Sequence, residues 1–443
     1  MTVSSLLLLI MFVSLLAGLL LGTPLAYVLG GVACIIGYLG WGSSTFSIIM
    51  SQTFGVMNNY TLIAIPMFVL MANFLTDSGV ADGLFETVRK LFGGTRGGLA
   101  AAVMLVSAVF AATTGVVGAS VLTMGLLALP ILDKYNYDHG LAAGTVCAGG
   151  SLGILIPPSI MLVTMASLAQ VSVSKLLLSA FVPGVLLAIV YIVYILVTCK
   201  IHPAKGPAMS KEEIAAMDKG KLWRDVLINL VPPLILIAGV LGTIFLGVAT
   251  PTEASACGAV LALILTICYG NFSLKMLHDS VIGCLKTSAM CFFIMIAANS
   301  FCAIFFALGG DTMIENFVAS VGIGKWGCFI FMMALIFFMG MFIDWIGIVA
   351  IILPIFLPIL TNMGFENTLW LCTCMAVIMQ TCFMTPPFGF ALFYVKSLLP
   401  KGYTMMEVYK GVVPFIIAVL VVTVLVVVFP DLVMWLPNMS YGS

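Results

Sequence analysis

Long apolar segments separated by short polar stretches run along almost the whole chain. Four of the clearest segments, residues 6–21, 227–246, 288–308 and 412–429, contain no charged residue. Each comes close to the ~20 apolar residues that a helix needs to cross ~30 Å of hydrocarbon. A helix also satisfies its own backbone hydrogen bonds, as a segment in lipid must. The pattern therefore predicts an all-α integral membrane protein with many crossings.

The apolar pattern repeats at about half the length of the chain, and helix breakers mark the repeat. Thr23-Pro24 returns 227 residues later as Thr250-Pro251, and Pro157-Pro158 returns 229 residues later as Pro386-Pro387. Repeated halves with interrupted helices are typical of secondary transporters, in which the binding site lies where the interrupted helices meet. We therefore expect two copies of one membrane unit.

A polar stretch separates the two copies. We expect a first repeat over residues 1–205, a cytoplasmic linker or amphipathic arm over 206–226, and a second repeat over 227–443. If both termini lie outside, 15 of the 17 basic residues fall on the cytoplasmic side, and only Lys175 and Lys325 fall outside. This distribution follows the positive-inside rule. An odd number of crossings separates the copies, so we expect an inverted-topology two-fold repeat.

Each copy contains a glycine-bearing apolar run whose two ends are expected on the same side of the membrane. Such a run predicts a re-entrant helical hairpin. The first is expected at about 97–133 with its tip at residues 113–120, and the second at about 325–362 with its tip at residues 340–344. One hairpin is expected to enter from each face of the membrane.

Two further kinds of helix are expected in each copy. The stretches over residues 45–58 and 273–287 are amphipathic and not apolar enough to span. They favour helices lying at the membrane interface, with a solvent loop as the alternative. Short helices with polar flanks are expected over residues 81–92 and 311–321.

After each hairpin, consecutive prolines interrupt an apolar segment. The predicted broken helices cover about 140–168 and about 369–397. Two prolines remove two backbone donors and clash with the preceding turn. Carbonyl groups left unpaired at membrane depth need protein, water or a cation, and hydroxyl side chains stand beside both breaks. Oxygen ligands suit a hard cation such as Na⁺, and half-helix N-termini suit a carboxylate. A packing kink is the alternative.

Four motifs are distributed along the chain: Gly153 to Ser159, Thr114 to Ser120, Pro251 to Ala254 and Met384 to Gly389. In combination they resemble the large membrane subunit, the DctM family, of tripartite ATP-independent periplasmic (TRAP) transporters, and the resemblance covers essentially the whole chain. It implies Na⁺-coupled import of an organic acid anion across a bacterial or archaeal inner (plasma) membrane. It also implies the ion transporter superfamily fold, in which a scaffold holds an elevator-like transport domain.

The resemblance also implies two partners and two or more Na⁺ sites. The partners are a four-helix small membrane subunit of the DctQ type and a periplasmic substrate-binding protein of the DctP type. One Na⁺ would lie between the first tip and the first break, and another between the second tip and the second break. The implied cation-binding residues are Thr113, Thr114, Gly115, Ser120, Gly149, Ser151, Gly153, Gly340, Asp344, Thr381 and Thr385. The implied substrate-binding residues are Gly118, Ser120, Pro157, Ser159, Thr385, Pro386 and Gly389.

The sequence does not identify which organic acid is the substrate. The stretch from Asp344 to Pro358, together with residues 409–414, resembles the branch associated with 2-oxo acids, lactate and similar monocarboxylates more than the C4-dicarboxylate branch. Sugar acids also remain candidates.

Two acidic residues are expected at or near membrane depth. Asp344 is expected to bind Na⁺ or a proton, because intramembrane carboxylates are usually functional. The alternative is a cap for the helix that begins at Trp345. Glu253 lies two residues after Pro251, in the first turn of a helix, where the helix dipole alone explains an acid.

Composition narrows the classes of function. Only 8% of the residues are charged, against roughly 25% in an average soluble domain, so membrane lipids surround the chain. The net charge is zero, which gives no reason to expect nucleic acid. An intramembrane enzyme would need convergent ionisable groups, and the three histidines are scattered. We therefore expect a transporter, with a Na⁺- or H⁺-coupled carboxylate symporter that works alone as the alternative.

The twelve cysteines lie mostly in apolar runs and are expected to be buried packing residues.

Overall fold

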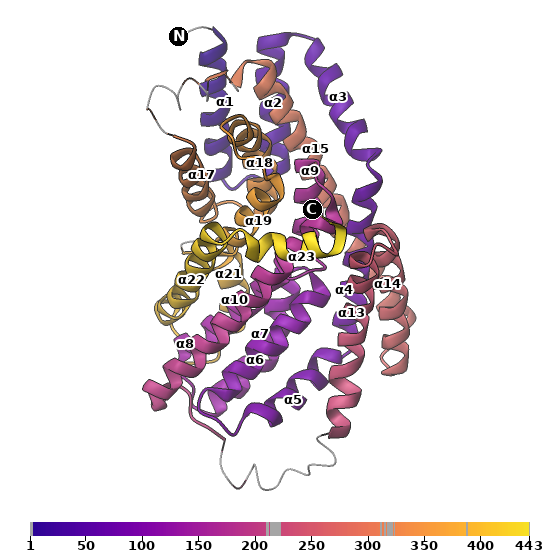
Figure 1. The fold of residues 1–443 in the computed structure, drawn as a ribbon, viewed down its shortest axis with the longest axis vertical. Helices are drawn as coiled ribbons and strands as arrows, with labels where there is room; N and C mark the ends of the chain where they lie inside the picture. Colours follow the sequence, from indigo (N-terminus) through magenta and orange to yellow (C-terminus); the bar gives the residue numbers. More distant parts are fainter. Residues whose placement is uncertain are drawn as a thin grey trace.

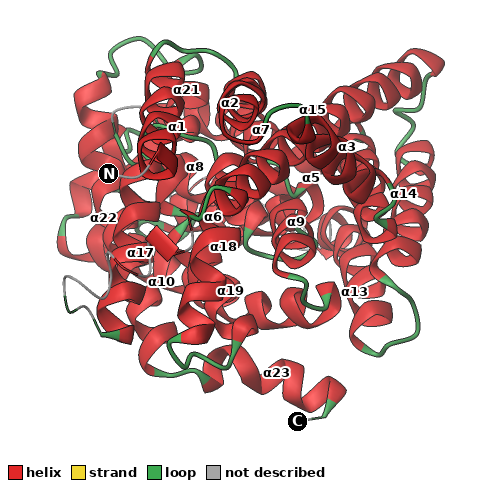
Figure 2. Ribbon diagram, turned by 90° about the horizontal axis from the view of Figure 1, so that it is seen from above, coloured by secondary structure: helices red, strands yellow, loops and turns green. Residues whose placement is uncertain are grey.

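The structure is a computed structural model that describes residues 3–209, 223–310, 324–386 and 389–442, together with five single positions. These are residues 212, 312, 313, 316 and 322. In this part of the chain the regular elements are helices and no strand occurs (Figure 2). Eight of the described helices are long and apolar enough to cross a membrane. The expectation of an all-α membrane protein is therefore confirmed.

The first half of the described chain contains ten α-helices and two short 3-10 helices (Figure 1). In chain order they are α1 (Val3–Leu20), α2 (Leu25–Trp41), α3 (Ser44–Met57), η1 (Tyr60–Ile63), α4 (Ala64–Asp77), α5 (Val80–Phe92), α6 (Gly98–Thr114), α7 (Val117–Lys134), α8 (His139–Ser151), η2 (Leu152–Ile154), α9 (Ile160–Ala169) and α10 (Val173–Ile201).

The second half of the described chain follows the same order of hairpin and interrupted helix. Its elements are η3 (Pro203–Lys205), η4 (Val226–Leu230), α13 (Val231–Phe245), α14 (Pro251–Cys268), α15 (Leu274–Ala307), α17 (Lys325–Met339), α18 (Trp345–Asn362), α19 (Thr368–Ile378), α20 (Thr381–Met384), α21 (Phe390–Lys396), α22 (Met405–Val428) and α23 (Asp431–Tyr441).

The helices pack into two groups. In the outer group, α1–α4 and α13–α15, the helix α14 packs along α4, and α15 packs against α2, α3 and α4. In the inner group, α6–α10 and α17–α22, the helix α8 packs against α6, α7 and α22. Figure 1 shows α13 and α14 at one edge of the molecule and α8 and α22 toward the opposite edge. The groups meet where α15 packs on α18 and where α4 packs on α6 and α9.

One expected element is wrong. Residues 273–287 do not form a separate interface helix, because Leu274–Ala307 is a single helix of 34 residues. The helix contains no proline, so nothing in its sequence breaks the backbone hydrogen bonding. In the first copy the equivalent segment is interrupted, since α3 ends at Met57 and the Asn59 side chain accepts a hydrogen bond from the Thr61 N–H at 3.0 Å.

Two other expectations fall partly outside the described residues. Most of the short helix expected over 311–321 lies outside the described residues. The same is true of the centre of the linker expected over 206–226. At the end of that linker, the apolar helix that is long enough to span begins at Trp223 and continues to Phe245. The short helix expected over 81–92 is α5.

The roles expected for the cysteines and for Glu253 are confirmed. All twelve cysteines are free, and nine of them are buried. The Glu253 carboxylate accepts a hydrogen bond from the Thr250 N–H at 2.8 Å, and the Glu253 N–H donates to the Thr250 hydroxyl at 3.3 Å. This reciprocal capping box explains an acid at the start of α14.

Glycines allow α8 and α22 to cross at close range. A Cβ atom added at Gly411 would lie 2.0 Å from the carbonyl oxygen of Gly140. A Cβ atom added at Gly144 would lie 2.6 Å from the carbonyl oxygen of Gly411. Backbone therefore packs directly on backbone, as small residues permit between membrane helices.

Replacing Gly411 by alanine is expected to destabilise the protein by about 1–3 kcal/mol, since the added methyl group forces the two backbones apart. Thermal unfolding of the purified chain in detergent checks this. Gly239→Ala is the matched control, because no atom lies within 4 Å of its added Cβ in α13. The control should be neutral or stabilise by about 0.5–1 kcal/mol. Equal melting temperatures for the two variants would contradict the close crossing.

Candidate functional site

The first broken helix separates α8 from α9. Its two prolines, Pro157 and Pro158, cannot donate hydrogen bonds, so the chain leaves the helix after η2. Ser159 then starts α9: its hydroxyl accepts a hydrogen bond from the Leu162 N–H at 3.4 Å and donates to the carbonyl of Ile154. The two half-helices are therefore joined across the break by one serine side chain.

The break leaves a run of buried carbonyl groups that have no partner among the described residues. Residues 155–158 are buried, and their carbonyl oxygens accept no hydrogen bond from the described part of the chain. Buried backbone oxygens are nearly always paired with protein, water or an ion. Such oxygens are suitable ligands for a small hard cation.

The first hairpin places its tip directly against this break. Gly115 joins α6 to α7 with φ +60, and a Cβ atom added there would lie 3.2 Å from the Pro158 carbonyl oxygen. Next to it, the hydroxyls of Thr114 and Ser120 form a hydrogen bond of 2.6 Å and are fully buried. A Cβ atom added at Gly153 would meet the carbonyl oxygen of Ala111 at 2.7 Å. Four of the implied first-site residues are thus brought together.

The remaining first-site residues are close in sequence to these four: Thr113 directly precedes Thr114, and Ser151 and Gly149 precede Gly153 by two and four residues. Gly149 packs against Ser107, whose hydroxyl is buried and has no partner in the described structure. The Ser151 hydroxyl donates to the Ala148 carbonyl at 2.9 Å. Thr113 lies in the last turn of α6.

The second break has a similar relation to the second tip. A Cβ atom added at Gly340, at the end of α17, would lie 2.2 Å from the Cys382 sulfur in α20. The Thr381 hydroxyl donates to the Ile378 carbonyl at 2.7 Å, and the Thr385 hydroxyl donates to the Thr381 carbonyl at 2.6 Å. Pro386 is described, whereas residues 387–388 lie outside the described residues.

Asp344 lies at the N-cap position of α18, as the capping alternative requires, but it forms no capping hydrogen bond. Its carboxylate is near the N–H groups of Trp345 and Ile346 and within electrostatic reach of Cys382 and Tyr394. The side chain is half-buried. A carboxylate at a hairpin tip can bind a cation or a proton, and its nearness to the first N–H groups of α18 also fits the capping alternative.

Tyr394 connects the two copies, and the sequence analysis did not identify it. A Cβ atom added at Gly118 would lie 2.9 Å from the Tyr394 ring, so the first hairpin packs on α21. The same tyrosine is near Asp344 at the second tip. Gly389 precedes α21 with φ +31, and a Cβ atom added there would lie 2.9 Å from the Leu392 side chain and 3.0 Å from the Phe383 carbonyl oxygen. The second broken helix therefore touches both hairpins.

Gln380 is a second residue that the sequence analysis missed. It is fully buried between α19 and α20, and neither its Oε1 nor its Nε2 atom has a hydrogen-bond partner in the described structure. Unsatisfied buried amides are rare and call for an explanation such as an ion or water. The sequence signal for Gln380 is an uncharged amide residue that lies in an apolar segment next to a helix break.

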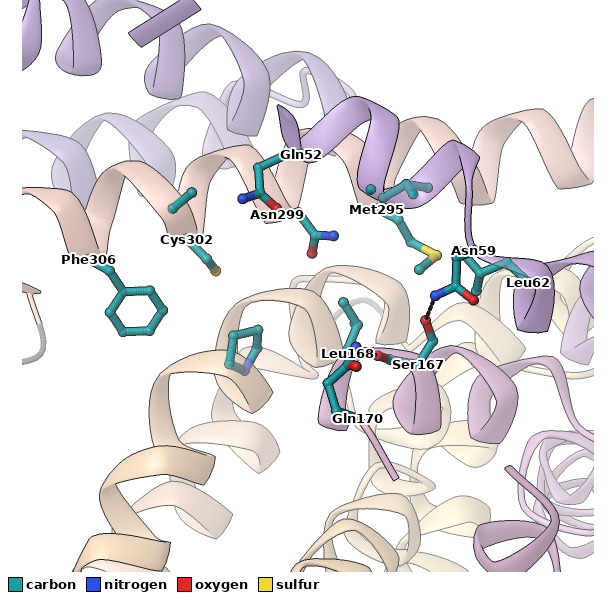
Figure 3. A pocket seen from close by; sticks show the side chains of 14 residues that line it. Gln52, Asn59, Leu62, Ser167, Leu168, Gln170, Met295, Asn299, Cys302 and Phe306 are labelled. Atoms are coloured by element: carbon teal, nitrogen blue, oxygen red, sulfur yellow. Dashed lines mark hydrogen bonds between the residues drawn. The ribbon is translucent and has the colours of Figure 1, made fainter. Parts of the chain in front are cut away.

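A cavity of about 340 Å³ lies between the two groups of helices (Figure 3). The outer group contributes residues from α3, η1 and α15, and the inner group contributes the end of α9 and one proline of α18. The lining residues are Gln52, Gly55, Val56, Asn59, Leu62, Ser167, Leu168, Gln170, Met295, Asn299, Cys302, Ala303, Phe306 and Pro354. None of the implied substrate-binding residues is among them.

The polar lining of this cavity consists of amides and one hydroxyl. The Asn59 amide donates to the Ser167 hydroxyl at 2.8 Å and so joins the outer group to the inner group. The Gln170 amide donates to the Ser167 carbonyl at 2.7 Å. In Figure 3 the side chains of Gln52 and Asn299 extend into the same space from α3 and α15. The described lining residues include no charged side chain.

Within the described residues, no three His, Cys, Asp or Glu side chains come close enough to hold a metal ion together. The convergent groups are therefore backbone carbonyls, hydroxyls, amides and one carboxylate. Such a set suits a monovalent hard cation and a small polar ligand better than a transition metal.

The chain is similar to known membrane transport proteins. The family described as "Tripartite ATP-independent periplasmic transporter, DctM component" matches residues 12–432. The C4-dicarboxylate TRAP transporter large permease protein DctM of Pseudomonas aeruginosa is 32% identical over 392 residues, 87% of this chain and 88% of that protein. The sialic acid TRAP transporter large permease protein SiaM of Vibrio cholerae is 26% identical over 393 residues, covering 88% and 89%.

One solved structure has a similar fold. The YdaH transporter of Alcanivorax borkumensis, described as having an unusual topology, aligns with a TM-score of 0.64 over 96% of this chain and 98% of that chain. The sequences are only 15% identical. The similarity therefore concerns the arrangement of helices.

Gln380→Met is expected to leave the protein at least as stable without Na⁺, because it removes an unsatisfied buried amide that costs about 1–3 kcal/mol. The same change should reduce the stabilisation that Na⁺ produces. Melting temperatures in sodium chloride and choline chloride check both parts.

Thr373→Val is the control for this measurement. The Thr373 hydroxyl donates to Leu369 at 2.9 Å and is 2.7 Å from the Ser179 hydroxyl, so its loss should destabilise the fold in both salts. A Gln380→Met variant that is destabilised as much as the control, with an unchanged response to Na⁺, would contradict the interpretation of Gln380.

Proposed function

The chain belongs to the DctM family, the large membrane component of tripartite ATP-independent periplasmic transporters, and we propose that it imports an organic acid anion together with Na⁺. It is a multi-span membrane transport subunit rather than an enzyme. The single observation that carries the proposal of Na⁺ coupling is the run of unpaired buried carbonyls at residues 155–158, with the Gly115 tip against it.

Two cation sites are proposed, one at each break. The first uses carbonyl oxygens of the first break with the Thr114 and Ser120 hydroxyls. The second uses Asp344, Gln380 and the carbonyl and hydroxyl oxygens near Thr381. A helix interruption at membrane depth is stable only where protein, water or an ion satisfies its polar groups. Na⁺ would therefore complete the packing of each hairpin tip on its broken helix.

The substrate is proposed to occupy the cavity of about 340 Å³ between the outer and inner groups. Its volume lies in the ~300–1,000 Å³ range of small-molecule sites. The inner group contains both hairpins and both broken helices, so we propose that it forms the transport domain and that the outer group forms the scaffold. The inverted repeat expected from the sequence would support alternating access by movement of one group against the other. The Asn59–Ser167 hydrogen bond would break during that movement.

A small membrane subunit and a periplasmic substrate-binding protein are the proposed partners, since the family is tripartite. The proposed location is the inner membrane, with both termini outside. Large apolar side chains are exposed on α1, α3, α14 and α22, and these surfaces suit lipid or the small subunit. Without its partners the chain is expected to bind Na⁺ but to transport slowly or not at all.

Na⁺ is expected to raise the melting temperature of the purified chain, and the stabilisation should rise with the logarithm of Na⁺ concentration at the slope of two bound ions rather than one. At 100 times the dissociation constant, one site adds about 2.7 kcal/mol of stability. Potassium and choline chloride at equal ionic strength should have no comparable effect. Identical curves in the three salts would contradict Na⁺ coupling.

Asp344→Asn separates the two roles considered for this residue. If Asp344 binds the second cation, the Asn variant should need at least ten-fold more Na⁺ for the same gain in melting temperature. Asn and Asp cap helices about equally well, so a capping role predicts an unchanged Na⁺ curve. A proton-binding role predicts that stabilisation depends on pH rather than on Na⁺, and this would favour H⁺ coupling instead.

A further inference from the structure

A second cavity, of about 230 Å³, lies between α8, α10 and α22. It shares no lining residue with the cavity of about 340 Å³. Its lining includes two carboxylates, two ammonium groups and two hydroxyls, which belong to Asp138, Glu407, Lys205, Lys410, Tyr194 and Thr198. The cavity thus gathers charges of both signs in a chain in which only 8% of the residues are charged.

The opposite charges around this cavity do not pair with one another. The Asp138 N–H donates to the Lys205 carbonyl at 3.0 Å, and Glu407 precedes Lys410 by three residues on α22. Even so, neither lysine forms an ion pair with a described residue. An ion pair with the same three-residue spacing does form on α5, at 2.6 Å. Two ammonium groups therefore remain unpaired beside two carboxylates.

Each carboxylate has one oxygen to spare. Asp138 Oδ1 accepts a hydrogen bond from the Leu141 N–H at 2.9 Å, at the start of α8. Glu407 Oε2 accepts one from the Thr404 N–H at 2.8 Å and lies 3.5 Å from His139 Nδ1. Asp138 Oδ2 and Glu407 Oε1 accept no hydrogen bond within the described part of the chain. Both oxygens can accept one from a ligand.

The cavity lies at the ends of two helices that are long and apolar enough to span the membrane. Tyr194 and Thr198 lie in the last part of α10, and Lys410 lies in the first part of α22. The ends of a spanning helix reach the level of the lipid headgroups. In Figure 1, α8 and α22 lie toward the edge of the molecule opposite α13 and α14. A phospholipid headgroup can reach the cavity at this level.

Exposed apolar side chains lead away from the cavity along both helices. On α10, Val193 and Val197 are 52% and 48% exposed, and Val197 directly precedes Thr198 of the lining. On α22, Val413 and Ile417 are 46% and 54% exposed, and Val413 directly follows the last residue of the first part of the helix. Residues four apart lie on one face of a helix. Each face can hold an acyl chain beside a headgroup bound in the cavity.

From these features we propose that the cavity binds the headgroup of a phosphatidylethanolamine-type phospholipid, with the phosphate against Lys205 and Lys410 and the primary ammonium against Asp138 and Glu407. The inference does not depend on which ion or acid the protein carries. A primary ammonium presents three donors, which match the spare carboxylate oxygens, and lysine is a common ligand of phosphate.

Other common headgroups match the cavity less well. The trimethylammonium group of phosphatidylcholine has no N–H donor and is typically bound by aromatic cages, whereas Tyr194 is the only aromatic residue among the described lining residues. The headgroup of phosphatidylglycerol is an anion without a cationic group, so it would place negative charge beside Asp138 and Glu407 without satisfying them.

Native mass spectrometry of the purified full chain measures the selectivity directly. The chain is mixed with equal amounts of dioleoyl phosphatidylethanolamine, phosphatidylcholine and phosphatidylglycerol, and the most tightly retained lipid is identified by mass. Phosphatidylethanolamine should be enriched about ten-fold over each of the others, because only its headgroup forms both sets of charge-assisted hydrogen bonds. Equal retention of the three lipids, or a preference for one of the other two, would overturn the proposal.

Two double variants test the site itself. Asp138→Asn with Glu407→Gln removes both negative charges and keeps residues that can cap their helices, so it should change the preference to phosphatidylglycerol. Lys205→Gln with Lys410→Gln should abolish the enrichment of phosphatidylethanolamine.

Lys396→Gln with Lys401→Gln is the matched control, since both lysines are exposed and neither lines the cavity. The control should keep the wild-type preference. Unchanged preference in the carboxylate variant at an unchanged melting temperature would overturn the proposal. An equal loss of enrichment in the control and in the variant of the cavity lysines would also overturn it.

Soluble glycerophosphoethanolamine separates a lipid from a free zwitterion. It has the same phosphate and primary ammonium groups but no acyl chains. In millimolar excess it should leave the bound phosphatidylethanolamine in place, because it lacks the apolar contacts along α10 and α22. Full displacement of the lipid would show that the cavity serves a soluble zwitterion and would overturn the proposal of a lipid site.

Discussion

Backbone carbonyl groups buried within a membrane protein need partners, and this requirement organises the inner group of helices. Pro157 and Pro158 prevent α8 from continuing into α9, so the carbonyl groups before and between the half-helices lose their intrahelical donors. The Ser159 hydroxyl satisfies one of them. The first hairpin then brings Gly115 against the rest, where the left-handed backbone at φ +60 favours glycine and an added Cβ atom would lie only 3.2 Å from the Pro158 carbonyl oxygen. The break, the glycine tip and the cation proposed between them are therefore parts of one arrangement.

The second hairpin and the second broken helix extend this arrangement across the inner group. Tyr394 packs on Gly118 of the first hairpin and is within electrostatic reach of Asp344 at the second tip, so it lies between the two proposed cation sites. The proposed substrate cavity is separate from both tips and lies where α9 and α18 meet the outer group. Cation binding at the tips would thus affect substrate binding by changing the positions of α9 and α18, without direct contact between cation and substrate.

Local signals explain how far the sequence alone indicates this structure. The glycines at the tips and the paired prolines at the breaks interrupt apolar helices, so both tips and both breaks could be predicted from short motifs. The same motif does not always have this effect, because Pro232-Pro233 lies in the first turn of α13 without a break. The continuity of α15 could not be predicted, because Lys275 and Lys286 make its N-terminal part resemble a helix at the membrane interface. Nothing in the local sequence shows that this part continues into the apolar segment. The cavity could not be predicted either. Gln52 and Asn299 belong to helices far apart in the sequence, and only the packing of α3 on α15 brings them together.

Hydrogen–deuterium exchange of the purified chain, compared in sodium chloride and choline chloride, tests the central claim most directly. If Na⁺ completes the two breaks, it should slow exchange in peptides that cover residues 113–121, 149–163, 338–346 and 378–386. Exchange in α13 and α14 of the outer group should stay the same. Equal exchange at the tips and breaks in both salts, or a uniform change over the whole chain, would contradict the account.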